Sequence, residues 1–321
     1  LEKKKKNICK KILIKKKMSI DYYRKNLKYR THVRKGEFEM VKFEKYQGLG
    51  NDFIIVNEKE LIEKGIPDYN EFAALVCDRH FGVGADGLLI LKYVANMPFM
   101  FYYNSDGSQA PMCGNGIRCF AHYIKNNKIV EEDTFVVKVV PGDLTIETHQ
   151  EEEGDFWAKV NMGKPIFTVN KIIKTDKEEF INEKITVNNQ EIEISYIFMG
   201  TDHAVVFVED LTNVNVVELG SAIENYTELF PKKTNVNFVQ VKDRKNIEII
   251  TWERGAGLTL ACGTGATASA VVANHLGFVE NEVNVKVPGG ELIIEANGKD
   301  NDAFMTGPSE KIAEGDYMIK R

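Results

Sequence analysis

The sequence lacks any apolar run that could cross a membrane as a helix, which takes about 18 or more residues. The only apolar run of the first forty residues, at positions 12–14, is too short for the core of a signal peptide. No cysteine pair or Cys/His cluster has the spacing of zinc ligands. These absences exclude an integral membrane protein and a zinc-finger-like protein, and they predict a soluble protein without a metal.

The cysteines are few, and their number is odd. The five residues are spaced irregularly, which is not typical of a disulfide framework: Cys9, Cys77, Cys113, Cys119 and Cys262. We therefore expect reduced thiols and a cytoplasmic location. Cys77 and Cys119 lie on apolar faces of predicted helices and are interpreted as core residues.

The charge is unevenly distributed along the chain. Residues 1–40 hold 15 Lys and Arg against 4 Asp and Glu, whereas the remainder holds 27 basic and 43 acidic residues. An acidic body argues against a nucleic-acid groove, so neither nucleic acid nor membrane is expected as a partner. Residues 1–40 are predicted to be a basic, disordered extension, with a nucleic-acid or membrane-surface tail as the weaker alternative.

The rest of the chain repeats itself once. Residues 112–116 (Met-Cys-Gly-Asn-Gly) recur at 261–265 (Ala-Cys-Gly-Thr-Gly). Upstream, Gly50 precedes its cysteine by 63 residues and Gly200 precedes its cysteine by 62. Downstream, a Val-Lys-Val segment with a Pro-Gly turn recurs in the same register. We infer two copies of one unit. They are predicted as domains at residues 41–154 and 155–321. The last strand of the second domain is left open to return to the first domain.

Each copy is predicted to contain many short strands around one long helix. Apolar β-prone runs predict strands at 41–46, 53–56, 87–91, 99–103, 135–139 and 144–147, and then at 204–208, 236–241, 247–252, 283–287 and 292–295. A helix is expected just after each repeated cysteine, with shorter helices at 69–77 and 219–226. This pattern predicts an α+β fold of two pseudo-symmetric domains, each a mostly antiparallel, barrel-like sheet around a central helix.

The repeated Cys-Gly-x-Gly sequence points to acid–base chemistry. A helix N-terminus presents unpaired N–H groups and partial positive charge, which suit a substrate carboxylate and lower the pKa of a cysteine placed there. Two such units facing each other would place one sulfur on each side of a substrate carbon. One thiolate could remove the α-proton and the opposite thiol could return one, which inverts that carbon. We therefore predict Cys113 and Cys262 as the catalytic pair.

At these residues the chain resembles the diaminopimelate epimerase family. The resemblance covers residues 41–321, and several motifs carry it together: 48–53 (Gly-Leu-Gly-Asn-Asp-Phe), 78–87 (Asp-Arg-His-Phe-Gly-Val-Gly-Ala-Asp-Gly), 104–108 (Asn-Ser-Asp-Gly-Ser), 113–119 (Cys-Gly-Asn-Gly-Ile-Arg-Cys), 253–257 (Glu-Arg-Gly-Ala-Gly) and 261–265. It implies conversion of LL- to meso-diaminopimelate in lysine and cell-wall precursor biosynthesis. It also implies an active site between two domains, and neither metal nor pyridoxal phosphate.

The resemblance also implies roles for individual residues. The N–H groups that hold the reacting carboxylate are those of Gly114, Asn115, Gly263 and Thr264. The amino group at the reacting centre is contacted by Asn51 and Glu253, and the distal amino-carboxylate by Asn104, Asn235 and Arg254. His203 and Glu253 adjust the acidity of the sulfurs. The implied partner is a small amino-acid substrate, and a homodimer is left open.

Two positions depart from the family pattern, and two rival functions stay open. Thr201 replaces an Asn found in many members, which puts one distal-carboxylate contact in doubt, and Gly87 replaces a substrate-contacting Gln, so it is given no binding role. The nearest alternative function is that of a proline or hydroxyproline racemase, or of another small-acid isomerase built from the same two similar halves. The rival from another class is a non-enzymatic binder of small acids or phosphate.

Overall fold

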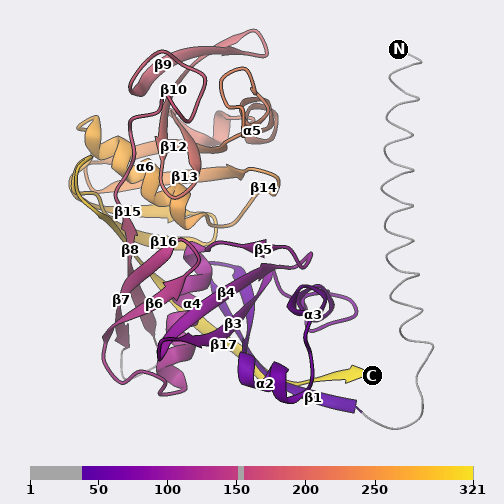
Figure 1. Cartoon of the computed structure of the whole chain (residues 1–321). Coiled ribbons are helices and arrows are strands. Elements are labelled where there is room, and N and C mark those ends of the chain that lie inside the picture. The colour runs from indigo at the N-terminus through magenta and orange to yellow at the C-terminus, as the bar shows by residue number, and fades with distance from the viewer. Residues whose placement is uncertain (1–37, 151–154, 321) are drawn as a thin grey trace, which may run out of the picture. The chain divides into compact units, whose positions relative to one another are not determined.

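The computed structural model describes residues 38–150 and 155–320 (Figure 1). The predicted extension at 1–40 lies outside the described residues up to position 37, as does Cys9. Residues 43–315 form one compact unit, which contains both repeated cysteines; residues 38–42 and 316–320 belong to a second unit formed by the ends of the chain. In the described part, no helix is long and apolar enough to span a bilayer.

The first half of the compact unit is built from short strands around one buried helix. Its elements are β1 (Phe38–Gly48), β2 (Asn51–Asn57), α2 (Glu58–Glu63), α3 (Tyr69–Val76), β3 (Gly87–Val94), β4 (Met97–Asn104), β5 (Gln109–Ala110), α4 (Gly114–Asn126), β6 (Thr134–Val139), β7 (Gly142–Gln150) and β8 (Phe156–Gly163). Strands β2 and β3 are buried on both faces because α4 fills the inside while α2 and α3 cover the outside. This double burial explains their near-continuous apolar sequences.

The second half follows the same plan. Its elements are β9 (Phe180–Val187), β10 (Gln190–Phe198), β11 (Asp202–Phe207), a 3₁₀ turn (Leu211–Asn213), α5 (Val216–Glu224), β12 (Asn235–Asp243), β13 (Asn246–Glu253), β14 (Gly257–Leu258), α6 (Gly263–His275), β15 (Glu282–Val287), β16 (Gly290–Glu295) and β17 (Ala303–Lys320). Here α6 is the central helix, and α5 covers the outer side of β12 and β13.

Strand pairing in the two halves matches element by element. In the first half β2 runs parallel to β3, β3 antiparallel to β4, β4 parallel to β6, and β6 antiparallel to β7. In the second half β11, β12, β13, β15 and β16 repeat these relations in the same order. The equivalence extends to single residues, since Phe53 pairs with Gly87 as His203 pairs with Asn235. The predicted α+β fold of two pseudo-symmetric domains is therefore confirmed.

Strands β8 and β17 join the halves. Strand β17 pairs with β16 of the second half and with β8, and β8 pairs with β7 of the first half. Strand β17 also pairs with β1, where Lys311 Nζ lies 2.8 Å from a Glu44 carboxylate oxygen. These pairings close β1, β2, β3, β4, β6, β7, β8 and β17 into an eight-stranded barrel around α4. The predicted domain limits at 154 and 155 stay a prediction.

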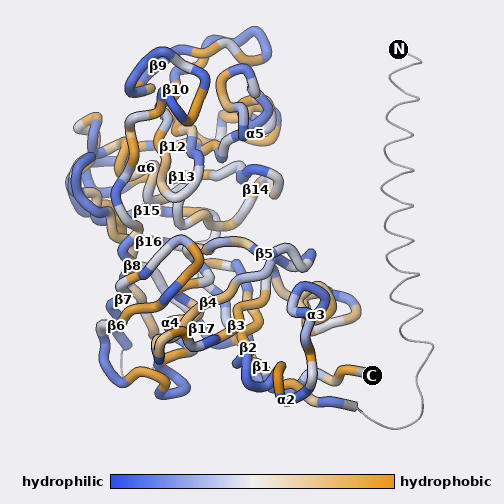
Figure 2. The backbone as a smooth tube through the Cα atoms, in the orientation of Figure 1, coloured by the Kyte–Doolittle hydropathy of each residue, from blue (hydrophilic) through white to orange (hydrophobic). Residues whose placement is uncertain are grey.

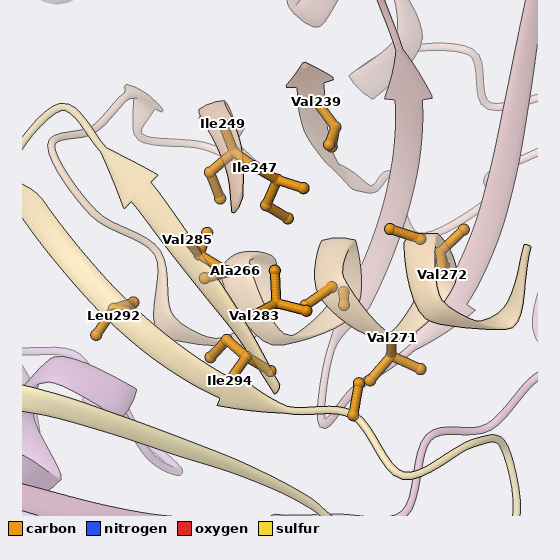
Figure 3. Packing of buried hydrophobic residues seen from close by; sticks show 14 of the residues in the cluster. Val239, Ile247, Ile249, Ala266, Val271, Val272, Val283, Val285, Leu292 and Ile294 are labelled. Carbon is orange, nitrogen blue, oxygen red and sulfur yellow. The ribbon is translucent and has the colours of Figure 1, made fainter. Parts of the chain in front are cut away.

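Two apolar cores, one in each half, are centred on the long helices, and a third cluster combines residues of α5 with residues of β9, β10, β11 and β12. One cluster surrounds α4, and a second surrounds α6, whose small side chains let the strands approach closely. Figure 3 shows Ala266, Val271 and Val272 of α6 packed against valine and isoleucine side chains of the neighbouring strands. Figure 2 places the hydrophobic stretches mainly in the strands and the hydrophilic ones in the connecting turns. Each core thus fixes the position of one helix N-terminus.

Candidate active site

Cys113 and Cys262 are the N-cap residues of the two central helices. Both have extended backbones, with φ −140° and ψ 125° at Cys113 and φ −122° and ψ 105° at Cys262, and neither side chain makes a capping hydrogen bond. The first-turn N–H groups of α4 and α6 are therefore left for a sulfur atom or a ligand. The predicted placement of each cysteine at the start of a helix is confirmed.

The two helix N-termini meet. A Cβ atom added to Gly114 would lie 3.4 Å from the Cα atom of Gly263, and one added to Gly263 would lie 2.9 Å from the Met305 sulfur. A side chain at Gly263 would therefore displace Met305, whereas a Cβ on Gly114 would be in van der Waals contact with the backbone of Gly263. The close approach brings two positive helix ends to one place, which is a favourable environment for a carboxylate.

The predicted lowering of the cysteine pKa values is wrong for this structure. Burial raises the pKa of Cys113, and the lowering by the N–H groups of Gly116 and Asn115 does not offset it. The pKa of Cys262, which is 7% exposed, is raised further, first by burial and then by the neighbouring charge of Glu253. Loss of solvation penalises a thiolate more than one helix end stabilises it. Burial also raises the pKa of the core thiols Cys77 and Cys119, each to about 12.

Glu253 lies beside both sulfurs. It ends β13, accepts a 2.6 Å hydrogen bond from Thr259 Oγ1, and its charge raises the pKa of both cysteines. Its own pKa is raised by burial and lowered by hydrogen bonds from Thr259 and Cys262. The charge of this carboxyl group therefore affects the ionisation of either thiol.

Asn51 is oriented by a carboxylate that the sequence analysis did not single out. Its Nδ2 atom donates to Asp86 Oδ2 at 2.7 Å, and because a carboxylate only accepts, Oδ1 must face the other way. That Oδ1 atom accepts from Cys113 Sγ at 3.8 Å and from Asn115 Nδ2 at 3.3 Å. Asn51 therefore presents an acceptor beside the first cysteine.

Asp86 is held by a charged network within the 78–87 motif. Arg79 donates to both Asp52 oxygens, at 2.7 and 3.1 Å, and to Asp86 Oδ1 at 2.8 Å, while Lys45 lies 2.8 Å from Asp52. The cationic neighbours hold the pKa of Asp52 at about 2, against the effect of burial. The 78–87 motif was interpreted only as a mark of resemblance, and Asp52, which contacts both Arg79 and Lys45, lies outside it.

His203 is fully buried and neutral. Its Nδ1 atom lies 3.1 Å from Asn237 Nδ2, and Asn237 Oδ1 accepts from Thr251 Oγ1 at 3.0 Å. Asn237 Nδ2 also donates to the Ala204 carbonyl at 3.3 Å, so the donor end of this amide faces Nδ1, which leaves the ring proton on Nε2. Burial lowers the pKa of His203 to about 3, and Nε2 has no hydrogen-bond partner among the described residues. Asn237 is a further site residue that the sequence analysis missed.

Arg254 is fixed by its neighbours on the second half. Its Nη1 atom donates to Asp202 Oδ2 at 3.0 Å and to the Lys232 carbonyl at 2.9 Å, and its Nη2 atom donates to Thr201 Oγ1 at 3.3 Å. Its backbone N–H donates to Asn235 Oδ1 at 2.9 Å. Thr201, the departure from the family pattern, accepts a hydrogen bond from this arginine. Arg254 and Asn235 are therefore brought together, as the sequence analysis required.

Asn104 and Gly87 lie together in the first half, opposite each other on neighbouring strands. Asn104 Oδ1 accepts from Tyr102 OH at 2.7 Å, and its Nδ2 atom donates to Ser108 Oγ at 2.9 Å. A Cβ atom on Gly87 would lie 2.6 Å from the Tyr102 ring, so this tyrosine occupies the space that a side chain at position 87 would need. The pKa of Tyr102 is raised first by burial and then by the negative charge of an ionised Cys113.

Among the described residues, no group of three or more His, Cys, Asp or Glu side chains is arranged to hold a metal ion. The expectations of no metal and no cofactor stay predictions. The polar groups that gather around the two sulfurs are instead single acceptors and donors suited to an amino acid.

The fold and the site define a duplicated α+β protein with one cysteine from each half at a shared helix-terminal site. The family model for diaminopimelate epimerase matches residues 43–168 and 195–312. Diaminopimelate epimerase of Caldanaerobacter subterraneus subsp. tengcongensis is 42% identical over 87% of this chain and 100% of its own length, and that of Clostridium perfringens is 44% identical over the same shares. The chain belongs to the diaminopimelate epimerase family.

The fold is shared more widely than the family. The solved structure of a hydroxyproline epimerase from Agrobacterium vitis, with bound trans-4-hydroxy-L-proline, matches with a TM-score of 0.64. It covers 89% of this chain and 93% of its own, at 12% sequence identity. At that identity the likeness shows the fold alone.

Proposed function

We propose that this protein epimerises LL-diaminopimelate to meso-diaminopimelate by a cofactor-independent two-base reaction. Membership of the family supports the substrate, and one observation carries the chemistry: two cysteines cap matched helices whose N-termini touch at Gly114 and Gly263. The substrate is a small molecule, and no feature of the described residues indicates a second reactant.

The proposed reaction moves one proton off Cα and another onto it. The thiolate of one cysteine takes the α-proton, so the C–H bond breaks and its electron pair passes into the substrate carboxylate. The thiol of the other cysteine then donates its proton to the opposite face, and its sulfur becomes the thiolate. The N–H groups of Gly114, Asn115, Gly263 and Thr264 are proposed to stabilise the developing charge, since they lie at two helix N-termini.

The reacting amino group is assigned to two acceptors beside the sulfurs. Asn51 Oδ1 faces Cys113, and Glu253 lies near both thiols. An ammonium group at Glu253 would neutralise the charge that raises both cysteine pKa values. Substrate binding would thereby help to generate the thiolate that the reaction needs.

The distal amino-carboxylate is assigned to Arg254, Asn235 and Asn104. Asp202 and Thr201 hold Arg254 at one edge, so its planar group is oriented before substrate arrives. Asn235 and Gly87 occupy equivalent places in the two halves, and only Asn235 has a side chain. This difference supports a distal pocket built mainly on the second half.

His203 is proposed to act on the sulfurs as a neutral donor. It is buried and uncharged, and it is linked through Asn237 to the first turn of α6, where a Cβ on Gly265 would lie 2.4 Å from Asn237 Oδ1. Its Nε2–H is available to a sulfur or to the substrate. A cytoplasmic location and a homodimer also remain proposals; the first is supported by the chemistry, because two thiols must stay reduced.

The substrate assignment is tested by deuterium wash-in at Cα with LL-diaminopimelate, L-proline and trans-4-hydroxy-L-proline in parallel. We expect exchange and epimer formation with diaminopimelate alone. Exchange with proline or hydroxyproline instead would favour the racemase alternative. No exchange with any of the three substrates would favour a binding protein, whereas full exchange after both thiols are alkylated would contradict the two-cysteine mechanism.

A further inference from the structure

Arg118 is a buried cation without a carboxylate partner. Its side chain is 0% exposed, and no ion pair among the described residues includes it. It donates instead to neutral acceptors: Gly114 O at 3.1 Å, Asn115 Oδ1 at 3.1 Å, Pro308 O at 3.2 Å and Met305 Sδ at 3.6 Å. A buried charge is costly unless it serves as the counterion of something nearby.

The atoms that Arg118 contacts belong to the start of α4. Gly114 and Asn115 directly follow Cys113, so the guanidinium lies under the turn that carries the first sulfur. Its positive charge acts to lower the pKa of Cys113. The other titratable groups that act on this thiol and its partner are Glu253, Tyr102 and Cys119, none of which is a cation.

Arg118 also fixes a side chain between the two cysteines. Because Asn115 Oδ1 accepts from Arg118, Asn115 Nδ2 must be the donor to Asn51 Oδ1 at 3.3 Å and to Ala261 O at 3.0 Å. Asn51 Oδ1 faces Cys113, and Ala261 precedes Cys262. One buried arginine therefore orients a contact that reaches both halves of the site.

The second half has no equivalent charge. The residue five positions after Cys113 is Arg118, and the residue five positions after Cys262 is Thr267. Thr267 Oγ1 donates to Gly263 O at 2.9 Å, the equivalent of the bond from Arg118 to Gly114 O. The same first-turn carbonyl is thus bound by a cation in one half and by a neutral hydroxyl in the other, while Glu253 adds negative charge beside Cys262.

We propose that Arg118 is a positioning residue that makes Cys113, and not Cys262, the first of the two thiols to ionise. It acts by placing an unneutralised positive charge under the first turn of α4 and by fixing Asn115. When one thiol of the pair loses its proton, the base then lies on the first half and the acid on the second, which suits the epimer whose α-proton faces Cys113. This inference rests on the proposed function, because the order of ionisation matters only if the two cysteines exchange protons with a substrate. The ionisation of the thiols is measured without substrate, so its test is separate from that of the proposed function.

The test is the pH dependence of alkylation of each thiol. The protein is treated with iodoacetamide across a pH series, and the modification of Cys113 and Cys262 is followed separately by peptide mass spectrometry. In the wild type we expect the Cys113 midpoint at the lower pH. Arg118→Gln, which keeps donors but removes the charge, should slow Cys113 alkylation at neutral pH about tenfold or more, equivalent to one pH unit. The Cys262 midpoint should stay or fall, because the two titrations are coupled.

Two further variants separate charge from structure. Arg118→Lys keeps the charge and should retain most of the Cys113 reactivity, whereas Thr267→Val, at the equivalent position, should leave the order of the two thiols unchanged. A folded Arg118→Gln protein with an unchanged Cys113 midpoint would overturn the proposal. If Arg118→Gln does not fold, the wild-type protein tests the proposal, because an alkylation midpoint at lower pH for Cys262 than for Cys113 would contradict it. None of these outcomes depends on which substrate the enzyme accepts.

Discussion

At the scale of single residues, the site is specified by what each polar atom is already bonded to. Asp86 forces Asn51 to turn its oxygen toward Cys113, and the Ala204 carbonyl, which accepts from Asn237 Nδ2 at 3.3 Å, fixes the nitrogen of Asn237 on the side of His203. Acceptor-only neighbours therefore decide the polarity of two amides that a sequence shows only as Asn. The hydrogen-bonding atoms that face the substrate are therefore set by the other contacts of the same side chains.

Arg254 should determine how well the distal end of the substrate is bound. Arg254→Lys keeps the charge but cannot keep the bonds to Asp202, Lys232 and Thr201 in one plane. We expect weaker binding by about 1–3 kcal/mol, the scale of a charge-assisted hydrogen bond, seen as a higher KM for diaminopimelate. Thr201→Val, which removes one contact to Arg254, is the milder control. Unchanged kinetics in Arg254→Ala would show that a shorter substrate is used.

Glu253 should control the pH at which the second thiol ionises. Its carboxylate raises the pKa of Cys262, so Glu253→Gln removes a negative neighbour and should move that pKa downward. The Cys262 thiolate then persists to lower pH, and alkylation of Cys262 should begin at lower pH than in the wild type. Epimerase activity should fall at the same time, because an acceptor for the amino group is lost. An upward shift of the Cys262 alkylation curve would contradict this role.

At the scale of secondary structure elements, the two helix starts are equivalent in sequence but differ in their surroundings. A Cβ on Gly116 would meet its nearest neighbours at 3.3 Å or more, whereas one on Gly265 would lie 2.4 Å from Asn237 Oδ1. Gly265→Ala should therefore displace Asn237 and with it His203, at a cost of about 1–3 kcal/mol in stability, typical of overpacking, and with loss of kcat. Gly116→Ala is the matched control and should be milder. Thermal unfolding and steady-state kinetics of both variants measure the difference, and equal effects would show that the Asn237 contact is unimportant.

Most elements of the fold could be predicted because the chain repeats and its strands are short and apolar. The strands predicted at 87–91 and 247–252 are β3 and β13, whereas the helix predicted at 219–226 begins earlier, at Val216. The hairpin of β9 and β10 was missed, although Asn188 and Asn189 adopt φ values of 51° and 61°, the conformation of a tight two-residue turn. The polar surface of these strands weakens the period-two pattern that would have revealed them.

The site was predictable only where a residue type has one obvious task. The cysteines and glycines at the helix starts could be found because duplication marks them. Arg118, Asp86 and Asn237 could not, because their importance depends on neighbours that are distant in sequence and on burial. The direction of the cysteine pKa shifts was wrong for the same reason: a sequence shows the helix terminus but not the loss of solvent around it.

At the scale of the whole molecule, the duplication explains why one site needs both halves. Strands β8 and β17 tie the halves together, and the N-termini of α4 and α6 meet between the two cores. Every symmetric pair of positions is then free to diverge: Asn51 with Thr201, Gly87 with Asn235, and Arg118 with Thr267. A substrate with two different ends can be bound in one orientation because the two halves differ in this way.

The meeting of the two halves should also create a redox liability. Two sulfurs that approach one carbon from opposite sides lie close together, so mild oxidation without substrate should join Cys113 to Cys262 when small motions bring their Cα atoms within about 4.4–6.8 Å. The raised pKa values make this oxidation slower at neutral pH than at alkaline pH. The product should be inactive, restored by a thiol reductant and prevented by diaminopimelate. Peptide mapping checks the pairing, and a bridge to the buried Cys77 or Cys119 would show that the two catalytic sulfurs do not face each other.

The central claim is that two cysteines, one on each side of Cα, share the reaction. It is tested most directly by following LL-diaminopimelate in heavy water with the wild type and with Cys113→Ser and Cys262→Ser. With two bases, the first meso product should carry solvent deuterium at Cα while the remaining LL substrate stays unlabelled, because a thiolate returns to the substrate only the proton it removed. Each serine variant should lose epimerisation by several orders of magnitude, since a hydroxyl is a far weaker acid. Early deuterium in the unconverted substrate together with near-normal epimerisation by either variant would contradict the account.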